Sequence, residues 1–480
     1  MQYKIKNSLT SQNVLLIASP KLPGLKATRG SLPISLMYLA GSLREAGHIP
    51  TIYDPSIISV HEANESNEHH VSKICEIIDK TKPSLIGLNC FSSMHFPIIR
   101  KLVAGIRSKK PNIPICLGGA HATFFSSDIL TNCPEFDYIV IGEGERQIVA
   151  LTNIIANNNW EQLKNIQAFC YRQNNKVIIN PRKEYIKDLD KLPLPAYDMI
   201  NFHDYYADHS SWYNPKGKEI KLSIPIYTTR SCPFNCNFCN ACSVMGRLLR
   251  KRNPKKVVDE IEMLTRDFGQ NYFSFTDDNV NLDKNHFITI CNDIKKRKLD
   301  IQLCIPQGMY INAVDEDIVQ AFVGAGGTTV SVPIESGSNF IRNKIIGKNL
   351  KEEKIYETVK IFQKYNLFTV GLFIMGFAED TASTLNNTLT MINKLNLDVN
   401  GVNTLIPFPG TKVYQQAVED NLLLFNDSNS WNGETFLDPL NKQDFFIKPY
   451  NMDVDELRHF RKIFDDLYIK SERAKSLNNH

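Results

Sequence analysis

Three cysteines stand close together in the middle of the chain, at Cys232, Cys236 and Cys239, in the spacing C-x3-C-x2-C. Three thiolates on one loop can bind three corners of an iron–sulfur cluster and leave the fourth iron without a protein ligand. Such an iron is a place for chemistry, just as an open coordination position distinguishes catalytic from structural zinc sites. The spacing therefore predicts a reactive cluster, and other parts of the chain must supply what reacts there.

A single zinc ion is the alternative for these thiols. Structural zinc sites need a fourth ligand, usually from a second C-x2-C or H-x3-H pair. Cys242 forms a further C-x2-C spacing with Cys239, but no second pair stands apart from the loop. We therefore favour the cluster and interpret Cys242 as an ordinary buried thiol.

The composition is that of an ordinary globular protein. The 480 residues suggest two or three domains, with 42% apolar and 22% charged residues. Lys+Arg 55 nearly balance Asp+Glu 51, a charge too balanced to imply nucleic acid or an acidic membrane as the main partner, and we expect neither. No apolar stretch approaches the ~20 residues of a membrane helix, and residues 1–10 lack a signal-peptide pattern. Eleven cysteines in such a chain predict the reducing cytoplasm.

Residues 10–156 predict an α/β domain with a parallel sheet of the flavodoxin or Rossmann-like type. Continuous apolar runs are typical of strands that are buried on both faces. Ligands of such sheets bind beyond the carboxyl ends of the strands. Strands are expected at 13–19, 48–54, 84–91, 113–119 and 136–141, and helices at 34–46, 71–80 and 97–107.

The alternation breaks at 157–222, which we interpret as a linker with a hairpin at 168–180. It resumes over 223–410 as six β/α units, which predicts a partial (β/α)6 TIM-like barrel with chemistry at the carboxyl ends of its strands. The cysteine loop directly follows the first of these strands. Residues 411–480 predict a small α-rich region. Strands are expected at 223–229, 272–277, 301–306, 328–335, 368–375 and 398–406, and helices at 254–267 and 453–473.

The cysteine loop resembles that of the radical S-adenosylmethionine (SAM) enzymes, including the aromatic Phe238 before the last cysteine. Stretches at later strand ends resemble the same family in the same order, over about 223–411. They are Thr-Asp-Asp-Asn at 276–279, Pro-Ile-Glu-Ser-Gly at 333–337, Gly-Phe-Ala-Glu-Asp-Thr at 376–381 and Pro-Phe-Pro-Gly-Thr at 407–411. The sequence departs from the family at Ser231, where many relatives have glycine, and at Ala378, where proline or glycine is more usual.

The resemblance implies a [4Fe–4S] cluster on the three cysteines, with SAM on its open iron. Asp277 and Asp278 suit the ammonium group of SAM, although Asp is also common as a helix N-cap. Glu335 suits the two ribose hydroxyls, and Glu379 is interpreted as a helix cap. The full set of expected SAM contacts is Tyr227, Phe238, Asp277, Asp278, Gln307, Glu335, Ser336 and Gly376.

The N-terminal part resembles the cobalamin (vitamin B12)-binding domains that are fused to radical SAM domains. The resemblance rests on Gly-Gly-Ala-His-Ala-Thr at 118–123 and on Gly-Glu-Gly-Glu at 142–145, where glycines let the backbone approach a bulky corrin. The Asp-x-His-x-x-Gly loop that ligates cobalt in other domains is absent, which implies a lower cobalt face without a histidine ligand. The expected cobalamin contacts are Ser19, Phe91, Ser92, Gly118, Gly119, His121, Thr123, Gly142 and Glu143.

Two branches of the family are set aside. Methylthiotransferases carry a second set of three cysteines in the N-terminal domain, whereas the five cysteines before residue 171 are scattered here. Many peptide-modifying members add auxiliary clusters near the C-terminus, yet no cysteine follows Cys304. The scattered thiols are interpreted as buried core residues.

These resemblances imply a cobalamin-dependent radical SAM enzyme. We expect a C-methyltransferase that acts on an unactivated carbon of a small metabolite or natural-product intermediate, through a 5′-deoxyadenosyl radical and methylcobalamin. A small-molecule substrate and an electron donor such as flavodoxin or ferredoxin are the expected partners. The first alternative is cyclisation, ring contraction or oxidation with the same cofactors but without methyl transfer. The second is a non-catalytic metal-binding sensor.

Overall fold

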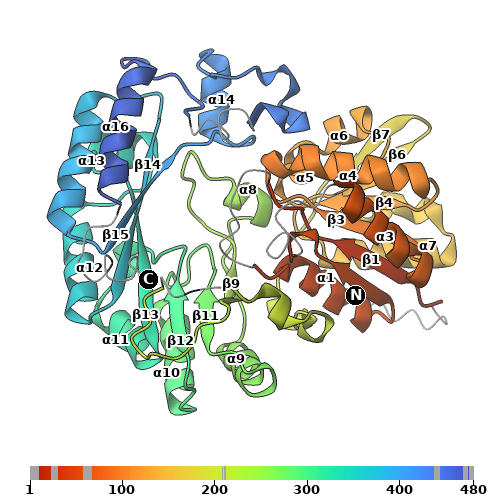
Figure 1. Ribbon diagram of the computed structural model, residues 1–480, viewed down its shortest axis with the longest axis horizontal. Helices are drawn as coiled ribbons and strands as arrows, with labels where there is room; N and C mark the ends of the chain where they lie inside the picture. Colours follow the sequence, from red (N-terminus) through yellow and green to blue (C-terminus); the bar gives the residue numbers. More distant parts are fainter. Residues whose placement is uncertain are drawn as a thin grey trace. The chain divides into compact units, whose positions relative to one another are not determined.

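The structure is a computed structural model that describes residues 10–22, 31–57, 67–207, 209, 212–436, 444–468 and 474. The chain forms two compact units (Figure 1). Unit 1 comprises Met1–Lys187, Lys191–Tyr205 and Ser428–Asp438, and unit 2 comprises Asp188–Asp190, Tyr206–Asp427 and Pro439–His480. Among the described helices, none combines the length and the apolar character needed to cross a bilayer.

Unit 1 is built on a seven-stranded sheet in the order β2-β1-β3-β4-β5-β6-β7. The first five of these strands are parallel, and β6 and β7 add an antiparallel edge. This is the doubly wound sheet that the apolar runs predict. The strands are β1 (Asn13–Ile17), β2 (Ile49–Tyr53), β3 (Leu85–Asn89), β4 (Ile115–Gly118), β5 (Tyr138–Val140), β6 (Phe169–Gln173) and β7 (Lys176–Asn180).

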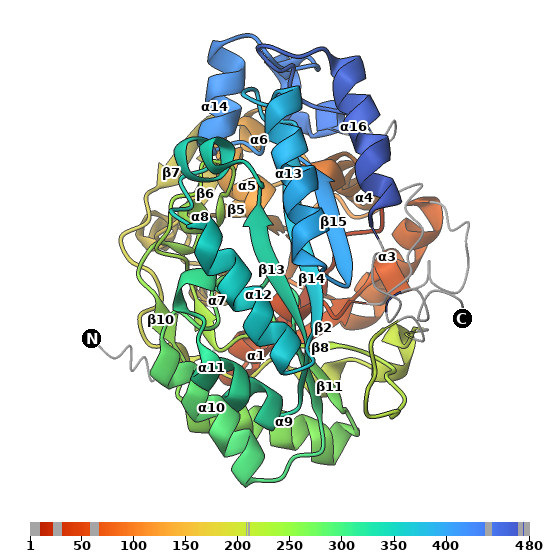
Figure 2. The ribbon, with the colours of Figure 1, turned by 90° about the vertical axis from the view of Figure 1, so that its left-hand side faces the viewer.

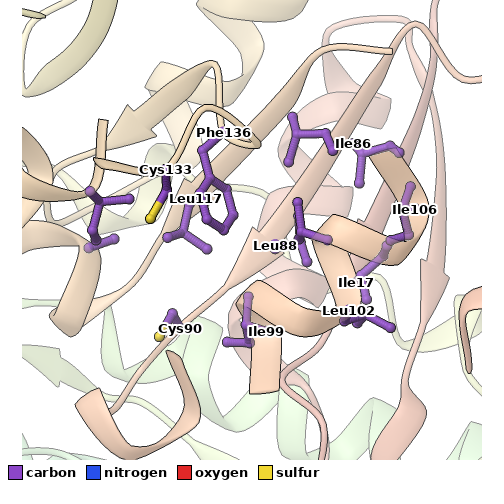
Figure 3. Close-up of a cluster of buried hydrophobic side chains, with 14 of the residues drawn as sticks. Ile17, Ile86, Leu88, Cys90, Ile99, Leu102, Ile106, Leu117, Cys133 and Phe136 are labelled. Atoms are coloured by element: carbon purple, nitrogen blue, oxygen red, sulfur yellow. The ribbon is translucent and has the colours of Figure 1, made fainter. Parts of the chain in front are cut away.

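Helices cover both faces of this sheet, so alternate strand residues enter two separate cores. In β1, Leu15 and Ile17 belong to one buried cluster and Val14 and Leu16 to the other. Figure 3 shows the first cluster, where Cys90 and Cys133 lie among aliphatic side chains, as expected for buried thiols. The helices are α1 (Ile34–Glu45), α3 (Asn67–Thr81), α4 (Phe96–Lys109), α5 (Ala120–Phe124), α6 (Ser126–Asn132) and α7 (Glu145–Asn157).

The segment expected as a linker, 157–222, is divided between the units. Its predicted hairpin is present as β6 and β7, with Asn174 and Asn175 at φ 51° and 59° in the turn. Two adjacent positive φ angles are what a tight hairpin turn requires. Because β6 pairs with β5, this hairpin extends the sheet of unit 1. The structure therefore places the part of the segment up to Lys187 in unit 1, beyond the boundary expected at residue 156.

Unit 2 contains an open six-stranded sheet with its strands in chain order, β15-β14-β13-β12-β11-β8, all parallel. Figure 2 shows α10 to α13 in front of these strands, as in a partial (β/α)6 barrel. The strands are β8 (Ile224–Ile226), β11 (Tyr272–Phe275), β12 (Gln302–Ile305), β13 (Gly327–Glu335), β14 (Phe368–Met375) and β15 (Val399–Thr404). The helices are α9 (Pro254–Phe268), α10 (Lys284–Lys296), α11 (Glu316–Gly324), α12 (Glu352–Lys364) and α13 (Ala382–Leu395).

The C-terminal region belongs to both units. In unit 2 it forms α14 (Lys412–Glu419) and α16 (Val454–Asp466), which packs on α13. The helix expected to reach residue 473 ends at Asp466, and its predicted last turn, at 469–473, lies outside the described residues. Residues 430–436 instead complete unit 1, where Trp431 packs on the Figure 3 cluster and Phe436 is fully buried. Gly433, at φ 74°, fits because a Cβ there would lie 2.1 Å from the Ser93 carbonyl oxygen.

Candidate functional site

The cysteine loop follows β8 at the carboxyl end of the unit 2 sheet, as predicted. A short strand, β9 (Thr229–Arg230), leads into the loop and pairs antiparallel with β10 (Arg250–Lys251) on its far side. Between them lie the three cysteines and the one-turn helix α8 (Ala241–Met245). The pairing of β9 with β10 therefore closes the base of the cysteine loop, and we call this pair the neck of the loop.

The three thiols are free and partly exposed. Burial raises the pKa of Cys232 to about 11 and that of Cys239 to about 12. The negative charges of Cys232 and Cys236 also raise the pKa of Cys239, so the three sulfurs lie within electrostatic reach of one another. Cys242 is partly exposed too, and the expectation that it is a buried thiol was wrong.

Over the described ranges, there is no group of three or more His, Cys, Asp or Glu side chains that could hold one metal ion. A [4Fe–4S] cluster makes a different demand, because each thiolate binds its own iron and the sulfurs stand farther apart than ligands of one ion. Three neighbouring thiols fit that donor set. Asn279 adds a hydrogen bond from Nδ2 to the Cys232 sulfur at 3.0 Å, the kind of contact that tunes cluster potentials.

The two adjacent acids after β11 have different surroundings. Asp277 is 1% exposed, and its Oδ1 accepts hydrogen bonds from the backbone and hydroxyl groups of Thr228 and Thr229. Burial raises its pKa to about 6. Asp278 is exposed, and its charge raises the pKa values of Cys232 and Cys239 after the larger effect of their burial. Asp278 is thus the carboxylate of the pair that a ligand beside the thiols can reach.

Glu335 closes β13 in a strained conformation. The strand register shifts between Pro333 and Glu335, and Glu335 has φ 69°, a region that costs a non-glycine residue stability. Its Oε1 accepts a hydrogen bond from Lys348 Nζ at 2.5 Å, which leaves the other oxygen for a hydroxyl group. The Lys348 charge also lowers the pKa of Cys236, although burial has the larger, opposite effect. Glu335 therefore stands near the thiols.

The other predicted SAM contacts also follow strand ends, with different exposure. Tyr227 is half-buried after β8, and Gln307 is exposed after β12. The Ser336 hydroxyl is buried 3.3 Å from the Thr388 hydroxyl of α13. Gly376, at φ 97°, donates its N–H to Asp380 Oδ2 at 2.9 Å. Phe238 is partly exposed, and its ring lies 6.5 Å from that of Phe377.

The helix cap expected at Glu379 belongs to other residues. Asp380 accepts hydrogen bonds from the N–H groups of Gly376 and Phe377. Thr381 is the N-cap of α13, with a reciprocal hydrogen bond from Thr384. Glu379 instead accepts a hydrogen bond from Gln416, so the expected cap was wrong by two positions.

In unit 1 the predicted cobalamin contacts lie along the carboxyl ends of β1, β3, β4 and β5. Several of them hold the loops together. Ser92 caps the 3-10 helix Ser93–His95 through the Met94 N–H, and Thr123 accepts from the Gly142 N–H at 2.9 Å. Glu143 is buried and accepts from the Ile186 N–H. Ser19 donates to the carbonyl of Asn89, a strand-end residue that the sequence analysis missed.

His121 is 2% exposed and lies between Phe96 and Phe125. Its Nδ1 stands 2.9 Å from the Ser93 hydroxyl. Burial lowers the pKa of His121 to about 3, although a hydrogen bond with the Trp431 backbone has a smaller, opposite effect. These contacts describe a neutral histidine that is enclosed in the fold rather than open to a ligand.

The edge of the unit 1 sheet at the carboxyl ends of its strands still has the open backbone that a corrin requires. Among the described residues, a Cβ on Gly118 would meet only Val140 Cβ, at 3.9 Å, so none of them fills that position. Gly119 is required by the packing of the protein itself, since at φ 108° a Cβ there would lie 2.3 Å from the Cys90 carbonyl oxygen. Beside them Phe91 is 59% exposed. Bare backbone flanked by an exposed aromatic ring fits a large planar ligand.

Three residues near the thiols escaped the sequence analysis. They are Asn279, Lys348 and Arg250, which hydrogen-bond Cys232, Glu335 and Ser231 respectively. Asn279 could have been found, because it stands in the same stretch as Asp277 and Asp278. Nothing in the local sequence separates Lys348 or Arg250 from the other lysines and arginines of the chain.

Comparison with known proteins finds a matching family model for each of two parts of the chain. The model of the B12 binding domain matches residues 24–152, and that of the Radical SAM superfamily matches residues 226–392. An uncharacterized methyltransferase of Pyrococcus horikoshii, PH0819, is 30% identical over 461 residues, which is 95% of this chain and 92% of that protein. The anaerobic magnesium-protoporphyrin IX monomethyl ester cyclase of Rubrivivax gelatinosus is 27% identical over 88% of this chain and 71% of its own.

A solved structure shares the fold over most of its length. The radical SAM methyltransferase TsrM of Kitasatospora setae superposes with a TM-score of 0.69 and 18% identity, over 87% of this chain and 79% of that one. Another structure of TsrM holds cobalamin and a [4Fe–4S] cluster. The two matched domains, the full-length relative and the shared fold confirm the predicted fold class. The chain therefore belongs to the radical SAM family that carries a B12-binding domain, and it is a cobalamin-dependent radical SAM enzyme.

Proposed function

We propose that this enzyme is a C-methyltransferase that acts on an unactivated carbon of a small metabolite or natural-product intermediate. The observation that carries the proposal is the match over 95% of the chain to a protein named as a methyltransferase. When bound, the cluster and SAM supply a radical that removes hydrogen from carbon, and cobalamin supplies the methyl group. The work of the protein is to hold these groups and the substrate.

In this proposal Cys232, Cys236 and Cys239 hold the cluster. The exposed carboxylate of Asp278 suits the ammonium group of SAM, and Glu335 suits a ribose hydroxyl while Lys348 holds its other oxygen. In unit 1 the bare backbone at Gly118 and the ring of Phe91 face the corrin. We further propose the cytoplasm as the location and a flavodoxin or ferredoxin as the electron donor.

Labelled SAM tests the proposal directly. Anaerobically reconstituted protein with reductant, SAM carrying a labelled methyl group and candidate substrates should release 5′-deoxyadenosine and place the label on the product. Without 5′-deoxyadenosine under any condition, the proposed methyl transfer to an unactivated carbon fails.

Ring formation or oxidation without methyl transfer is the second candidate. It is favoured by the relative named as a cyclase, which matches 88% of this chain. The same experiment separates the two reactions, since a cyclase would release 5′-deoxyadenosine while the labelled methyl group stays off the product.

A further inference from the structure

Ser231, the residue immediately before the first cysteine, has an unusual backbone conformation. Its φ is 87°, and it is 0% exposed. Positive φ is a region that glycine enters freely and that costs other residues stability. A serine persists there only where its surroundings hold it, so its contacts carry information.

The contacts of Ser231 form a closed set of hydrogen bonds. Its hydroxyl donates to the carbonyl oxygen of Met245 at 2.8 Å. The Ser231 hydroxyl oxygen also accepts hydrogen bonds from Arg250 Nη2 at 2.8 Å and from Arg250 Nε at 3.1 Å. Arg250 Nη2 also donates to the Met245 carbonyl at 2.8 Å. The three residues therefore bind one another pairwise, and the serine hydroxyl acts both as donor and as acceptor.

This set closes the neck of the cysteine loop. Arg250 stands opposite Arg230 in the β9–β10 pair, and Met245 ends α8. The hydrogen bonds thus join the residue before the loop to the residue after it and to the end of its helix. Thr228 and Thr229, which precede Ser231 in the chain, donate hydrogen bonds to Asp277.

The guanidinium group is well suited to this position. Arg250 is 4% exposed, and the planar fork of arginine can meet two acceptors at once, which a lysine ammonium cannot do with the same geometry. Hydrogen bonds from a charged donor in a water-poor place are stronger than neutral ones. They can offset the cost of the positive φ at Ser231.

We propose that the Ser231 hydroxyl and the Arg250 guanidinium form a latch that holds the backbone before Cys232 in its left-handed conformation. The latch thereby fixes where the first thiol of the loop stands, so Ser231 and Arg250 are positioning residues. This inference rests on the proposed role of Cys232 as a cluster ligand. It explains how a serine occupies a place that suits glycine.

Two substitutions at one position test the latch. Ser231→Ala removes the hydroxyl and keeps the strained φ, whereas Ser231→Gly removes both the hydroxyl and the strain. We expect Ser231→Ala to lose its reconstituted cluster to an iron chelator roughly tenfold faster than the unchanged protein. Ser231→Gly should stay within about twofold. Iron and sulfide per chain and the visible spectrum of the cluster give the readout, independent of activity.

Arg250 supplies the second arm of the test. Arg250→Met should speed cluster loss as Ser231→Ala does, and Arg250→Lys should recover only part of the loss. In a Ser231→Gly background, Arg250→Met should have a smaller effect, because glycine needs no latch. Lys251→Met is the matched control, since Lys251 is the exposed neighbour in the same strand and pairs with Asp283 at the surface.

The outcomes separate the latch from the ligand assignment. Cys232→Ala should leave no stable cluster. If it keeps the cluster, both the ligand assignment and the latch are overturned. If Cys232→Ala loses the cluster but Ser231→Ala and Ser231→Gly lose it at equal rates, only the latch is overturned. An equal effect of Arg250→Met in the serine and glycine backgrounds also overturns it.

Discussion

The strand-end edge of unit 1 and the cysteine loop of unit 2 prepare their ligand positions in different ways. At the edge, Ser92, Thr123 and His121 are tied into the fold, and no described residue covers the backbone at Gly118. In the loop, three partly exposed thiols depend on side chains around a neck. A site made of backbone should tolerate single side-chain changes, whereas a site made of side chains should not.

The largest difference should follow from Cys236→Ala. Loss of one of three cluster ligands should abolish stable iron binding and the formation of 5′-deoxyadenosine. Cobalamin binding should remain, because its predicted contacts all lie in unit 1. Iron analysis and corrinoid absorbance of the same sample measure both. Cys242→Ala is the matched control, and 5′-deoxyadenosine from the Cys236→Ala variant would sink the ligand assignment.

One buried group in each unit should contribute to stability with opposite dependence on acid. Burial lowers the pKa of His121 in unit 1 to about 3. The unfolded chain, with a histidine pKa of about 6.5, then binds the proton more readily, so unit 1 loses about 2 kcal/mol between pH 6.5 and pH 5. Burial raises the pKa of Asp380 in unit 2 to about 6. That contribution is fully present below about pH 4, and about 3 kcal/mol of it is lost as the pH rises through 6.

Urea unfolding at pH 5 and pH 7 measures this contrast, because Trp160 and Trp431 report on unit 1 and Trp212 on unit 2. At pH 5, His121 should lower the midpoint for unit 1 and Asp380 should raise it for unit 2, each relative to its own variant. His121→Gln and Asp380→Asn should each flatten the slope of their own unit. A common shift of both units that neither variant changes would contradict the prediction.

A smaller effect is expected at Glu335. Glu335→Gln keeps the shape of the side chain but removes the charge that pairs with Lys348. One charge-assisted contact to a ribose hydroxyl is lost, so the Kd for SAM should rise roughly tenfold. Equilibrium binding of SAM to the reconstituted protein measures it. Glu353→Gln, an exposed change on α12, is the control and should leave the affinity unaltered.

The smallest effect is expected at Phe91. If backbone makes the corrin site, removal of its exposed ring in Phe91→Ala should weaken cobalamin binding only about two- to tenfold. A corrinoid titration followed by absorbance tests this. Ile49→Ala is the matched control, since Ile49 is 57% exposed but stands at the amino end of β2. Complete loss of binding in Phe91→Ala would mean that side chains dominate in unit 1 as well.

Most of the fold could be predicted because its signals are local. Strands buried on both faces leave continuous apolar runs, and every strand expected in the two sheets is present. Helix α3 begins at Asn67, whereas the sequence predicted a start at 71. The prediction began too late because the first turn of the helix is polar and lacks the apolar period. Residues 430–436 could not be assigned to unit 1, since Trp431 packs on residues that are remote in sequence.

The site was predictable to the level of motifs but not of individual roles. Spacing alone identifies the three cysteines. It cannot tell Asp277 from Asp278, because two neighbouring acids are the same in composition and differ only in what surrounds them. The same holds for Arg250, whose role depends on the strand pairing that places it opposite Arg230.

Residues 430–436 have a consequence for the order in which the protein can mature. The ribosome makes the sheet of unit 1 first, then all strands of unit 2, and only afterwards the segment with Trp431 and Phe436. Until then, the apolar surface of unit 1 that receives Trp431 stays uncovered. Unit 1 therefore cannot finish folding before residues 430–436 have been translated. A fragment that ends before residue 428 would display that surface to solvent and should need a chaperone or the missing peptide to stay dissolved.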